Sequence, residues 1–466
     1  MPPVGSNREL SVTEVNQMQH RRNVIMIGLL TFVFLGAFFY SLRDFSATYA
    51  AGVIFLLGFF LISFINIRIG FILVIFAFLF SPEIHLPISA VRGFTLRSED
   101  ILIIALLLAW LGRLAMGLQN RFLIKTPLNL PIGLIVLWNI ICSFRAISAG
   151  MVDTNYCILV NLKIIEFFAV YFLVVNNLDN PKEAKFMLQI LLIVSLLIGI
   201  YATFQIPKTR MWSDTRLTAP FEGKPEPNTL GAYLAIFFGI ALSIFLYEKK
   251  SFLKKLCMLL LVLLPFPIMF SFARSAYIAT IAMVITISII SKRKWLFLSI
   301  IIFLILSPLI LPRPVIDRAL YNFKDPRYYG FLDPSAAERI GAFKKAMNYA
   351  KDYPIFGGGV AATGVILDNQ FARVIMETGI IGLILFLWLL FTTIRLGFNL
   401  FKSFNEGWIK GLAVGFIVVV IGLIMHCFGN ITFYIVRIAE PFWALAALIA
   451  FLLYYNGLER NSASLK

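Results

Sequence analysis

The apolar and polar positions of this chain alternate on the scale of whole membrane spans. Long apolar runs are separated by short polar connections, and they lie near residues 24–40, 48–65, 69–81, 100–116, 128–146, 156–176, 186–205, 229–247, 255–272, 275–290, 295–312, 371–398, 409–427 and 432–455. Most of these runs are long enough to cross about 30 Å of hydrocarbon as helices. The pattern predicts an all-α polytopic membrane protein with about 12–14 transmembrane helices, built as a single domain over residues 1–466.

The composition supports this prediction. The 466 residues are 60% hydrophobic and only 14% charged, which is too little polar surface to cover a soluble globule. A net charge of +17 would suggest nucleic acid in a soluble protein, but here the cations lie between the apolar runs, where membrane orientation and anionic lipid account for them. We therefore expect membrane lipid, and no nucleic acid, as a partner. The four cysteines lack the paired spacing of a metal site, so we expect core residues and no metal, with a Cys142–Cys157 disulfide as the alternative.

The cations also indicate an orientation. If the N-terminus is cytoplasmic and the run at 24–40 is an uncleaved first span, every cytoplasmic connection carries Lys or Arg, and the C-terminus is cytoplasmic as well. The outer segments 206–227 and 313–367 depart from the positive-inside rule because each holds several cations. Long translocated loops are exempt from the rule, so solvated lysines explain part of the excess. Arginine binds phosphate through two parallel hydrogen bonds, so the outer arginines suggest a lipid-linked phosphate or pyrophosphate as ligand.

The large outer loop 313–367 has a predicted structure of its own. Ser335 and Glu338 have the spacing of a capping box, and apolar residues then recur at helical spacing until Asp352-Tyr353-Pro354 ends the helix. Such an amphipathic helix lies on a membrane surface or packs against the ends of spans. The following Gly357-Gly358-Gly359 lacks the Gly-Lys-Ser/Thr of a phosphate-binding loop, so we interpret it as a permissive turn.

Two pairs of opposite charges lie inside predicted spans. Lys163 and Glu166 are three residues apart in the sixth run, and Arg437 and Glu440 have the same spacing in the last one. An ionisable group inside a membrane costs about 2.5 kcal/mol or more, so each such residue is a functional candidate. The simplest hypothesis is that each pair neutralises itself on one helix.

Other polar groups lie at the predicted outer boundary. Arg373 and Glu377 are four residues apart at the start of the run at 371–398, where they either pair or face a cavity. Arg274 occupies a short outer turn, where it either extends its guanidinium to the interface or binds phosphate. His426 near the outer end of its run is interpreted as a hydrogen-bonded interfacial histidine, with a catalytic base as the alternative.

Four separated pieces of the chain together resemble one family, the O-antigen ligase and polymerase membrane proteins of bacterial surface polysaccharide assembly. The pieces lie within residues 201–400 and are Arg216-Leu-Thr-Ala-Pro-Phe-Glu with Pro227-Asn228-Thr-Leu-Gly, Phe272-Ala-Arg274-Ser275-Ala, Glu338-Arg339 through Asp352-Tyr-Pro354-Ile-Phe-Gly357-Gly-Gly359, and Asp368-Asn369-Gln370 with Glu377-Thr-Gly379-Ile-Ile-Gly382. Each piece is weak by itself, but their order along the chain is specific.

The resemblance implies a GT-C-like helical enzyme of the bacterial inner membrane, with its active site on the outer side. Its donor would be a glycan on undecaprenyl pyrophosphate and its acceptor a glycan or a lipid-linked glycan. Arg216 and Arg339 would hold the donor pyrophosphate, with Arg274 as a third arginine. Because fixed cations stabilise the charge that develops on the leaving group, neither a metal nor another cofactor is expected.

The same resemblance points to further site residues around 368–377. Ligases of the family have a histidine after the glycine turn, whereas this chain has Asp368-Asn369-Gln370, which favours the polymerase branch. Asp368 and Glu377 are the candidates for the general base on the acceptor hydroxyl, with Glu222 behind them. Four more residues are expected to bind substrate, namely Asn228, Asn369, Gln370 and Arg373.

The leading hypothesis is therefore a polymerase of lipid-linked repeat units for O-antigen, capsule or exopolysaccharide. A ligase that transfers the glycan to lipid A core differs from it only in the acceptor. A transporter of lipid-linked oligosaccharide is the alternative of another class, but transporters tend to show internal repeats and a charged path at the bilayer midplane. A chain-length regulator and a flippase are the protein partners that such a pathway implies.

Overall fold

The structure confirms the predicted all-α polytopic fold. The computed structural model describes residues 47–84, 96–119, 121, 123–210, 215–222, 224–319, 334–362 and 368–464. Within these residues, nine helices are long and apolar enough to cross a membrane, and three shorter apolar helices lie at 52–65, 67–80 and 294–307. The predicted first span at 24–40 lies outside the described residues.

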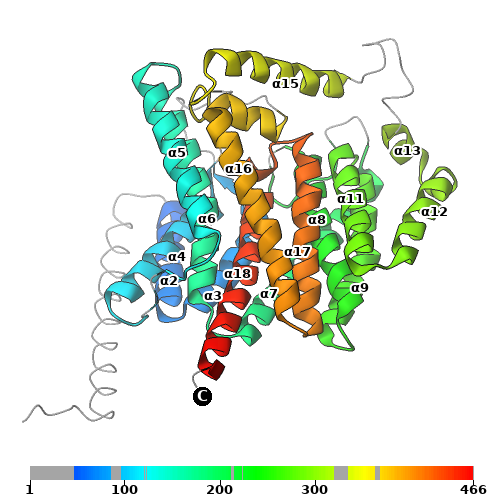
Figure 1. Ribbon diagram of the computed structural model, residues 1–466, viewed down its shortest axis with the longest axis horizontal. Coiled ribbons are helices and arrows are strands. Elements are labelled where there is room, and N and C mark those ends of the chain that lie inside the picture. The colour runs from blue at the N-terminus through cyan, green and yellow to red at the C-terminus, as the bar shows by residue number, and fades with distance from the viewer. Residues whose placement is uncertain are drawn as a thin grey trace, which may run out of the picture. The chain divides into compact units, whose positions relative to one another are not determined.

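Most of the described chain is helical (Figure 1). They are α2 (Ala47–Ile65), α3 (Ile67–Phe80), α4 (Ser98–Ala115), α5 (Asn129–Ser148), α6 (Thr154–Asn177), α7 (Pro181–Gln205), α8 (Pro227–Tyr247), α9 (Phe252–Leu263), α10 (Pro265–Phe270), α11 (Arg274–Ser291), α12 (Lys294–Ile310), α13 (Arg313–Ala319), α15 (Pro334–Asp352), α16 (Gln370–Ser403), α17 (Gly407–Cys427) and α18 (Val436–Ser464), with short 3-10 helices η1 (Ile206–Lys208) and η2 (Thr432–Tyr434). The two-residue strands β1 (Glu83–Ile84) and β2 (Leu96–Arg97) pair antiparallel.

The chain divides into two compact units. Of the described residues, the first unit holds those within 47–70 and 104–118, and the second holds those within 71–103 and from 119 onward. In the first unit Arg113 donates hydrogen bonds to the carbonyl oxygens of Phe64 and Ile65, at 2.6 and 3.1 Å, and so satisfies the C-terminal end of α2. The single-domain organisation remains a prediction.

The core of the second unit is formed by α8, α17 and α18, which are the most buried of its spans. Protein surrounds most of their surface, whereas the other spans of this unit leave half or more of theirs unburied. A glycine stripe on α17, Gly407, Gly411 and Gly415, lies against α8. A Cβ atom on Gly411 would lie 2.6 Å from the Cα atom of Ile244, so only glycine permits this close approach of the two backbones.

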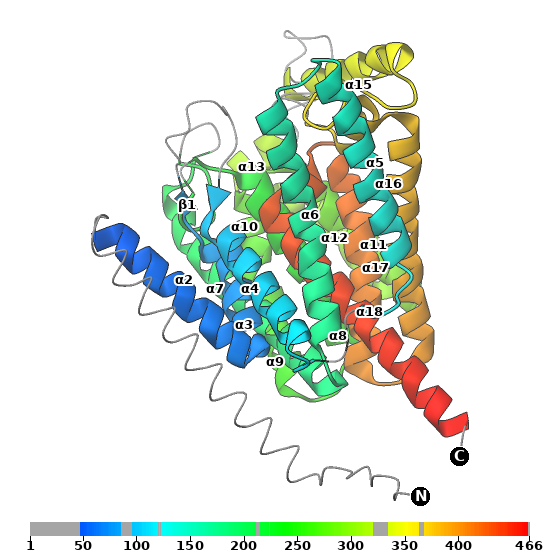
Figure 2. The same ribbon diagram turned by 90° about the vertical axis from the view of Figure 1, so that its left-hand side faces the viewer.

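The starts of several helices gather at one end of the second unit. In Figures 1 and 2, α15 lies across the end where α5 meets the turn to α6 and where α16 begins. The amphipathic helix predicted to end at Asp352 is thus confirmed as α15, and it contacts α16 through Ala346, Ala372 and Met376. Polar or charged residues lie at or next to the first residue of four spans of this unit, α8, α11, α16 and α18.

Candidate functional site

Three arginines gather around the turn that leads into α11, and we call Arg216, Arg274 and Arg318 the arginine cluster. The Arg216 Nη2 atom donates to the carbonyl oxygens of Ser271 and Phe272, both at 3.3 Å. The Arg318 Nε atom donates to the same Phe272 carbonyl at 3.2 Å. Arg274 is the first residue of α11, and all three side chains are half-buried. Residues from distant parts of the sequence thus place their positive charges at one turn.

The backbone of this turn adds to the positive potential. Phe272 has a φ of 55°, a left-handed conformation that is uncommon for a residue other than glycine. The N-terminus of α11 has no side-chain cap, and the same holds for the neighbouring N-terminus of α8. Gly231 in the first turns of α8 brings these two helix starts together, since a Cβ atom there would lie 2.9 Å from that of Ala276. Uncapped helix starts carry partial positive charge, so the arrangement favours an anion.

Arg216 retains hydrogen-bonding capacity at this site. Its Nε atom is buried and has no hydrogen-bond partner among the described residues. Burial lowers the pKa of the Arg216 guanidinium from its ordinary value, although arginine stays charged at neutral pH because that value is so high. A half-buried cation with an unused donor is suited to binding phosphate oxygens.

The second half of the site is built on a break in α16. Gly379 has a φ of 68° and a ψ of −166°, which interrupts the helix between its polar start and its membrane-spanning part. A Cβ atom at this position would lie 2.2 Å from the carbonyl oxygen of Ile355, so a larger residue does not fit. After the break, the Ile380 amide donates to the Pro354 carbonyl at 2.9 Å in place of a partner in its own helix.

The glycine turn at 357–359 donates hydrogen bonds to carbonyl groups that lose their helical partners at the break in α16. The Gly358 amide donates to the carbonyl of Met376 at 2.7 Å, and the Gly359 amide donates to that of Glu377 at 2.9 Å. The turn adopts left-handed conformations at its first and last glycines, with φ of 62° and 93°. The structure therefore confirms that the three glycines form a permissive turn, and it shows that their backbone also completes α16.

Helix α5 fixes this assembly from the other side. The Arg145 Nη1 atom donates to the Gly357 carbonyl at 2.8 Å, and its guanidinium lies 5.1 Å from the ring centre of Tyr353. The Trp138 indole donates to the Thr378 carbonyl at 2.9 Å, which satisfies a further backbone group at the break. Two side chains of one helix thus bind carbonyl groups of both the glycine turn and the broken helix.

Glu377, one of the two predicted bases, is fully buried and held by three groups. Its Oε1 atom accepts from the Arg373 Nε atom at 2.9 Å and from the Ala361 amide at 3.2 Å. Its Oε2 atom accepts from the Tyr434 hydroxyl at 2.8 Å. Burial, with the nearby Glu377 charge as a smaller cause, raises the pKa of Tyr434 well above its ordinary value, so the hydroxyl remains a donor. Arg373 and Glu377 therefore pair with each other.

Of the three predicted site residues at the start of α16, one is exposed and two are buried. Asp368, the other predicted base, is exposed. Asn369 caps α16, and its Nδ2 atom also donates to the Phe428 carbonyl at 3.3 Å. The Gln370 Oε1 atom accepts from the Phe433 amide at 3.0 Å. Asn369 and Gln370 thus bind the loop 428–434 to the start of α16, and Asp368 remains accessible beside them.

The loop 428–434 connects the two halves of the site. The Asn430 Nδ2 atom donates to the Ser275 hydroxyl at 2.7 Å, next to the arginine cluster. The His426 Nδ1 atom lies 2.9 Å from the Thr432 hydroxyl, and His426 is fully buried. The interpretation of His426 as a hydrogen-bonded histidine is confirmed. The residue after Arg274 and the start of α16 therefore both contact this loop.

Two further predicted site residues lie on α8 and α15. Asn228 is half-buried in the first turn of α8. Arg339 belongs to α15, and its side chain lies outside the described part of the protein. Arg318 was not among the predicted site residues, because one cation among many in a long loop carries no distinguishing pattern. Its convergence with Arg216 on one carbonyl appears only in the fold.

One predicted ion pair is wrong. Arg437 does not pair with Glu440, because its Nε atom lies 3.3 Å from the Oε1 atom of Glu222 and its Nη2 atom donates to the Pro220 carbonyl at 3.2 Å. Burial raises the pKa of the Glu222 carboxyl, and the Arg437 charge opposes that rise. Two side chains three residues apart on a helix point about 60° apart around its axis, so each can contact a different neighbour.

All four cysteines are free.

The other predicted intramembrane pair is confirmed. The Lys163 Nζ atom lies 3.1 Å from the Oε2 atom of Glu166 and also donates to Asp100. Lys163 therefore pairs with two carboxylates, Glu166 on its own helix and Asp100 on α4.

Comparison with known proteins identifies part of the chain. Residues 259–387 match a family model described as O-Antigen ligase. This segment contains the turn of the arginine cluster, Arg318, α15, the glycine turn and the break in α16. A search of curated proteins gave no match.

Proposed function

The chain is a protein of the O-antigen ligase/polymerase family, and on this premise we propose that it polymerises lipid-linked oligosaccharide repeat units. The donor is a glycan on undecaprenyl pyrophosphate at the outer leaflet of the inner membrane. The acceptor is a sugar hydroxyl of a second lipid-linked unit. Its multi-pass membrane architecture supports a substrate that stays in the bilayer.

The observation that carries the proposal is the arginine cluster at the uncapped starts of α8 and α11. In the transfer, the bond between the anomeric carbon and the pyrophosphate oxygen breaks as the acceptor oxygen bonds to that carbon. Undecaprenyl pyrophosphate leaves with the electron pair, and its charge increases at the oxygen that is released. Arginines fixed beside helix starts stabilise that charge more strongly in the transition state than in the bound donor.

The geometry favours Asp368 over Glu377 as the base that removes the acceptor proton. A general base must reach the hydroxyl with an accessible carboxylate oxygen. Both oxygens of Glu377 accept hydrogen bonds inside the protein, whereas Asp368 is exposed at the start of α16. In this proposal Glu377 and Arg373 position the glycine turn and the loop 428–434. Glu222, which pairs with Arg437, supports the segment that carries Arg216.

A ligase is the second candidate, because the matched family model is described by that activity. The two functions share the donor and the arginine cluster and differ in the acceptor. The Asp368-Asn369-Gln370 sequence favours the polymerase, since the resemblance associates a histidine in that segment with ligases.

The test is a transfer assay with purified protein in detergent. The protein is incubated with undecaprenyl-pyrophosphate-linked repeat units, with and without lipid A core, and the products are separated on a gel. A ladder from repeat units alone is the expected result, and transfer that requires lipid A core would show a ligase. No product in either lane, with the native substrate confirmed, would contradict both proposals and favour transport of the lipid-linked glycan.

A further inference from the structure

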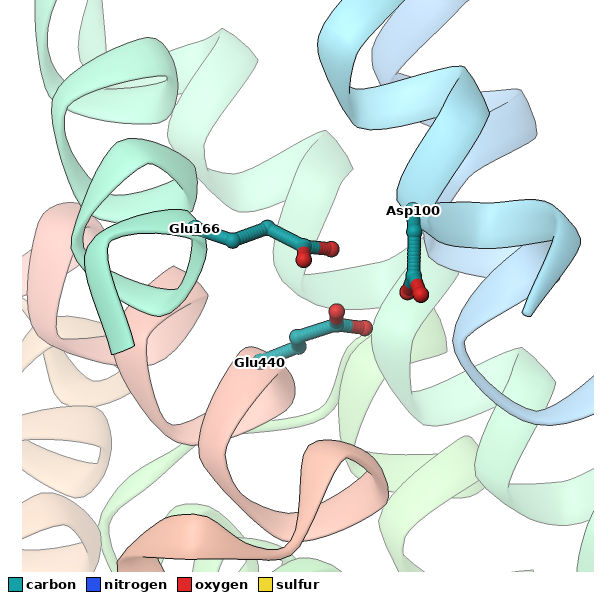
Figure 3. A group of neighbouring side chains, drawn as sticks. All are labelled: Asp100, Glu166 and Glu440. Atoms are coloured by element: carbon teal, nitrogen blue, oxygen red, sulfur yellow. The ribbon is translucent and has the colours of Figure 1, made fainter. Parts of the chain in front are cut away.

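A group of three carboxylates lies inside the second unit, apart from the arginine cluster. Asp100 comes from the first turn of α4, Glu166 from the middle of α6 and Glu440 from the first turns of α18. Figure 3 shows the three side chains pointing toward one another. One oxygen from each lies within 4.8 Å of those of the others, and Asp100 and Glu440 are buried, at 3% and 0% exposure. Elements from distant parts of the sequence thus place three negative groups in one apolar interior.

The charges of this carboxylate group are only partly compensated. Lys163 donates to one oxygen of Asp100 and one of Glu166, and it is the ammonium in contact with the group. These three carboxylates and Lys163 leave two negative charges when all are ionised, and the buried carboxyl of the neighbouring Glu99 adds to the negative potential at Glu440. Charges buried without compensation are strongly unfavourable, so a group with this composition requires a further positive charge or bound protons.

The unused oxygens are directed to one place. Both carboxylate oxygens of Glu440 and the Oε1 atom of Glu166 are buried without a hydrogen-bond partner among the described residues. The Glu440 carboxylate points to the other two carboxylates (Figure 3). This is the feature that separates the group from an ordinary ion-pair network, in which Lys163 would also satisfy Glu440 by a hydrogen bond. Carboxylate oxygens with no donor are ligands for hard cations.

We propose that Asp100, Glu166 and Glu440 bind one divalent hard cation of the size of Ca²⁺. Its charge of two would offset the excess of negative charge that Asp100, Glu166 and Glu440 have over Lys163. Two oxygens that each lie about 2.4 Å from one Ca²⁺ can be at most about 4.8 Å apart, and the three ligand atoms all lie within 4.8 Å of one another. Mg²⁺, with bonds of about 2.1 Å, allows at most about 4.2 Å and demands a more regular geometry.

The cation in this proposal has a structural role. It joins α4, α6 and α18, which reach the site from three separate parts of the chain. No step of glycan transfer is assigned to it, because the arginine cluster gathers at the turn before α11, whereas the carboxylates belong to three other helices. The inference therefore stands or fails independently of the proposed function.

The experiment measures cation binding and stability with no glycan substrate. Purified full-length protein in detergent is treated with a chelator and passed into chelator-free buffer, and Ca²⁺ or Mg²⁺ is then added while thermal unfolding is followed by tryptophan fluorescence. Metal content is measured in parallel by elemental analysis after removal of free ions. We expect about one bound Ca²⁺ per chain, a rise of several degrees in the unfolding midpoint, and a smaller rise with Mg²⁺.

Three substitutions separate the site from general effects. Glu440→Gln keeps the side-chain size but removes a ligand charge, so the bound ion and the shift are expected to be lost. Glu222→Gln changes another buried carboxylate, one that pairs with Arg437, and is expected to keep the bound ion and the shift. Lys163→Gln removes the competing ammonium and is expected to tighten Ca²⁺ binding at least about tenfold, since a unit charge near a divalent cation has a large effect at interior dielectric.

Three results would overturn the proposal. The first is wild-type protein that holds no metal and shows no shift, which would indicate that bound protons neutralise the carboxylates. The second is a shift that persists in Glu440→Gln. The third is weaker Ca²⁺ binding in Lys163→Gln. If Glu440→Gln fails to fold, the metal content of the wild type and the direction of the Lys163→Gln effect still decide the question.

Discussion

Individual arginines of this protein differ in their capacity to bind an anion because they contact different groups. Arg216 and Arg318 share the Phe272 carbonyl and lie at helix starts, whereas Arg210 bonds nearby carbonyls of its own loop and is exposed. The family resemblance found in the sequence identified Arg216 and Arg274 as site residues, but it did not identify Arg318. A motif marks residues at a characteristic spacing, but it does not show which loop cation folds back onto the same turn.

Arg216→Ala and Arg339→Ala are predicted to abolish glycan transfer, and Arg318→Ala is predicted to slow it by about 10²–10³-fold. Under the proposed function, each substitution removes a cation that would stabilise the leaving pyrophosphate. The measurement is the initial rate of product formation by purified variants whose yield and unfolding midpoint match the wild type. Arg210→Ala is the matched control and is expected to transfer at close to the normal rate. Near-normal transfer by both Arg216→Ala and Arg339→Ala would contradict the proposal that arginines bind the donor pyrophosphate.

The two candidate bases are predicted to respond in opposite ways. Glu377→Gln leaves Arg373 buried without its charge partner, so we expect a loss of about 3–5 kcal/mol of stability. Asp368→Asn changes an exposed residue and is expected to alter stability by less than about 0.5 kcal/mol while greatly lowering the transfer rate. Thermal unfolding and rate measurements on both variants test this. A stable, inactive Glu377→Gln together with an active Asp368→Asn would reverse the assignment.

At the scale of elements, α16 shows what hydrophobic pattern does and does not reveal. The apolar run at 371–398 and its polar start were predictable, because length and hydropathy define a span. The break at Gly379 was not, because a single glycine inside an apolar run does not by itself indicate a left-handed conformation. Its physical cause lies in other segments, since Pro354, the glycine turn and Trp138 supply the hydrogen bonds that the helix lacks there.

Gly379→Ala is predicted to destabilise the protein by about 1–3 kcal/mol, because the conformation at this position is essentially restricted to glycine and the added Cβ atom would meet Ile355. The unfolding midpoint in detergent measures the effect. Gly133→Ala is the control, since Gly133 lies within α5 and a Cβ atom added there would have nothing within 4 Å. There alanine is expected to stabilise the helix by about 0.5–1 kcal/mol. Equal effects of the two substitutions would contradict the assigned role of the break.

For the whole molecule, the membrane fold follows from composition, but only part of its internal charge pairing could be predicted. The 60% hydrophobic content and the long apolar runs were sufficient to predict an all-α polytopic protein. Pairs within one helix were the natural expectation for Lys163 and Arg437. In the structure each meets a carboxylate from a distant segment, Asp100 in one case and Glu222 in the other. Such contacts depend on how helices pack, which a single sequence does not encode in its local pattern.

The glycine stripe of α17 has a consequence for the outer surface of the protein. Because Gly411 and Gly415 bring α17 and α8 into backbone contact, the two helices cannot slide or rotate separately without opening that seam. The start of α8 adjoins the turn of the arginine cluster, and the end of α17 leads into the loop that binds the start of α16. The two helices are therefore expected to move together as one rigid unit. We therefore expect the spacing between the turn of the arginine cluster and the start of α16 to stay the same in bilayers of different thickness.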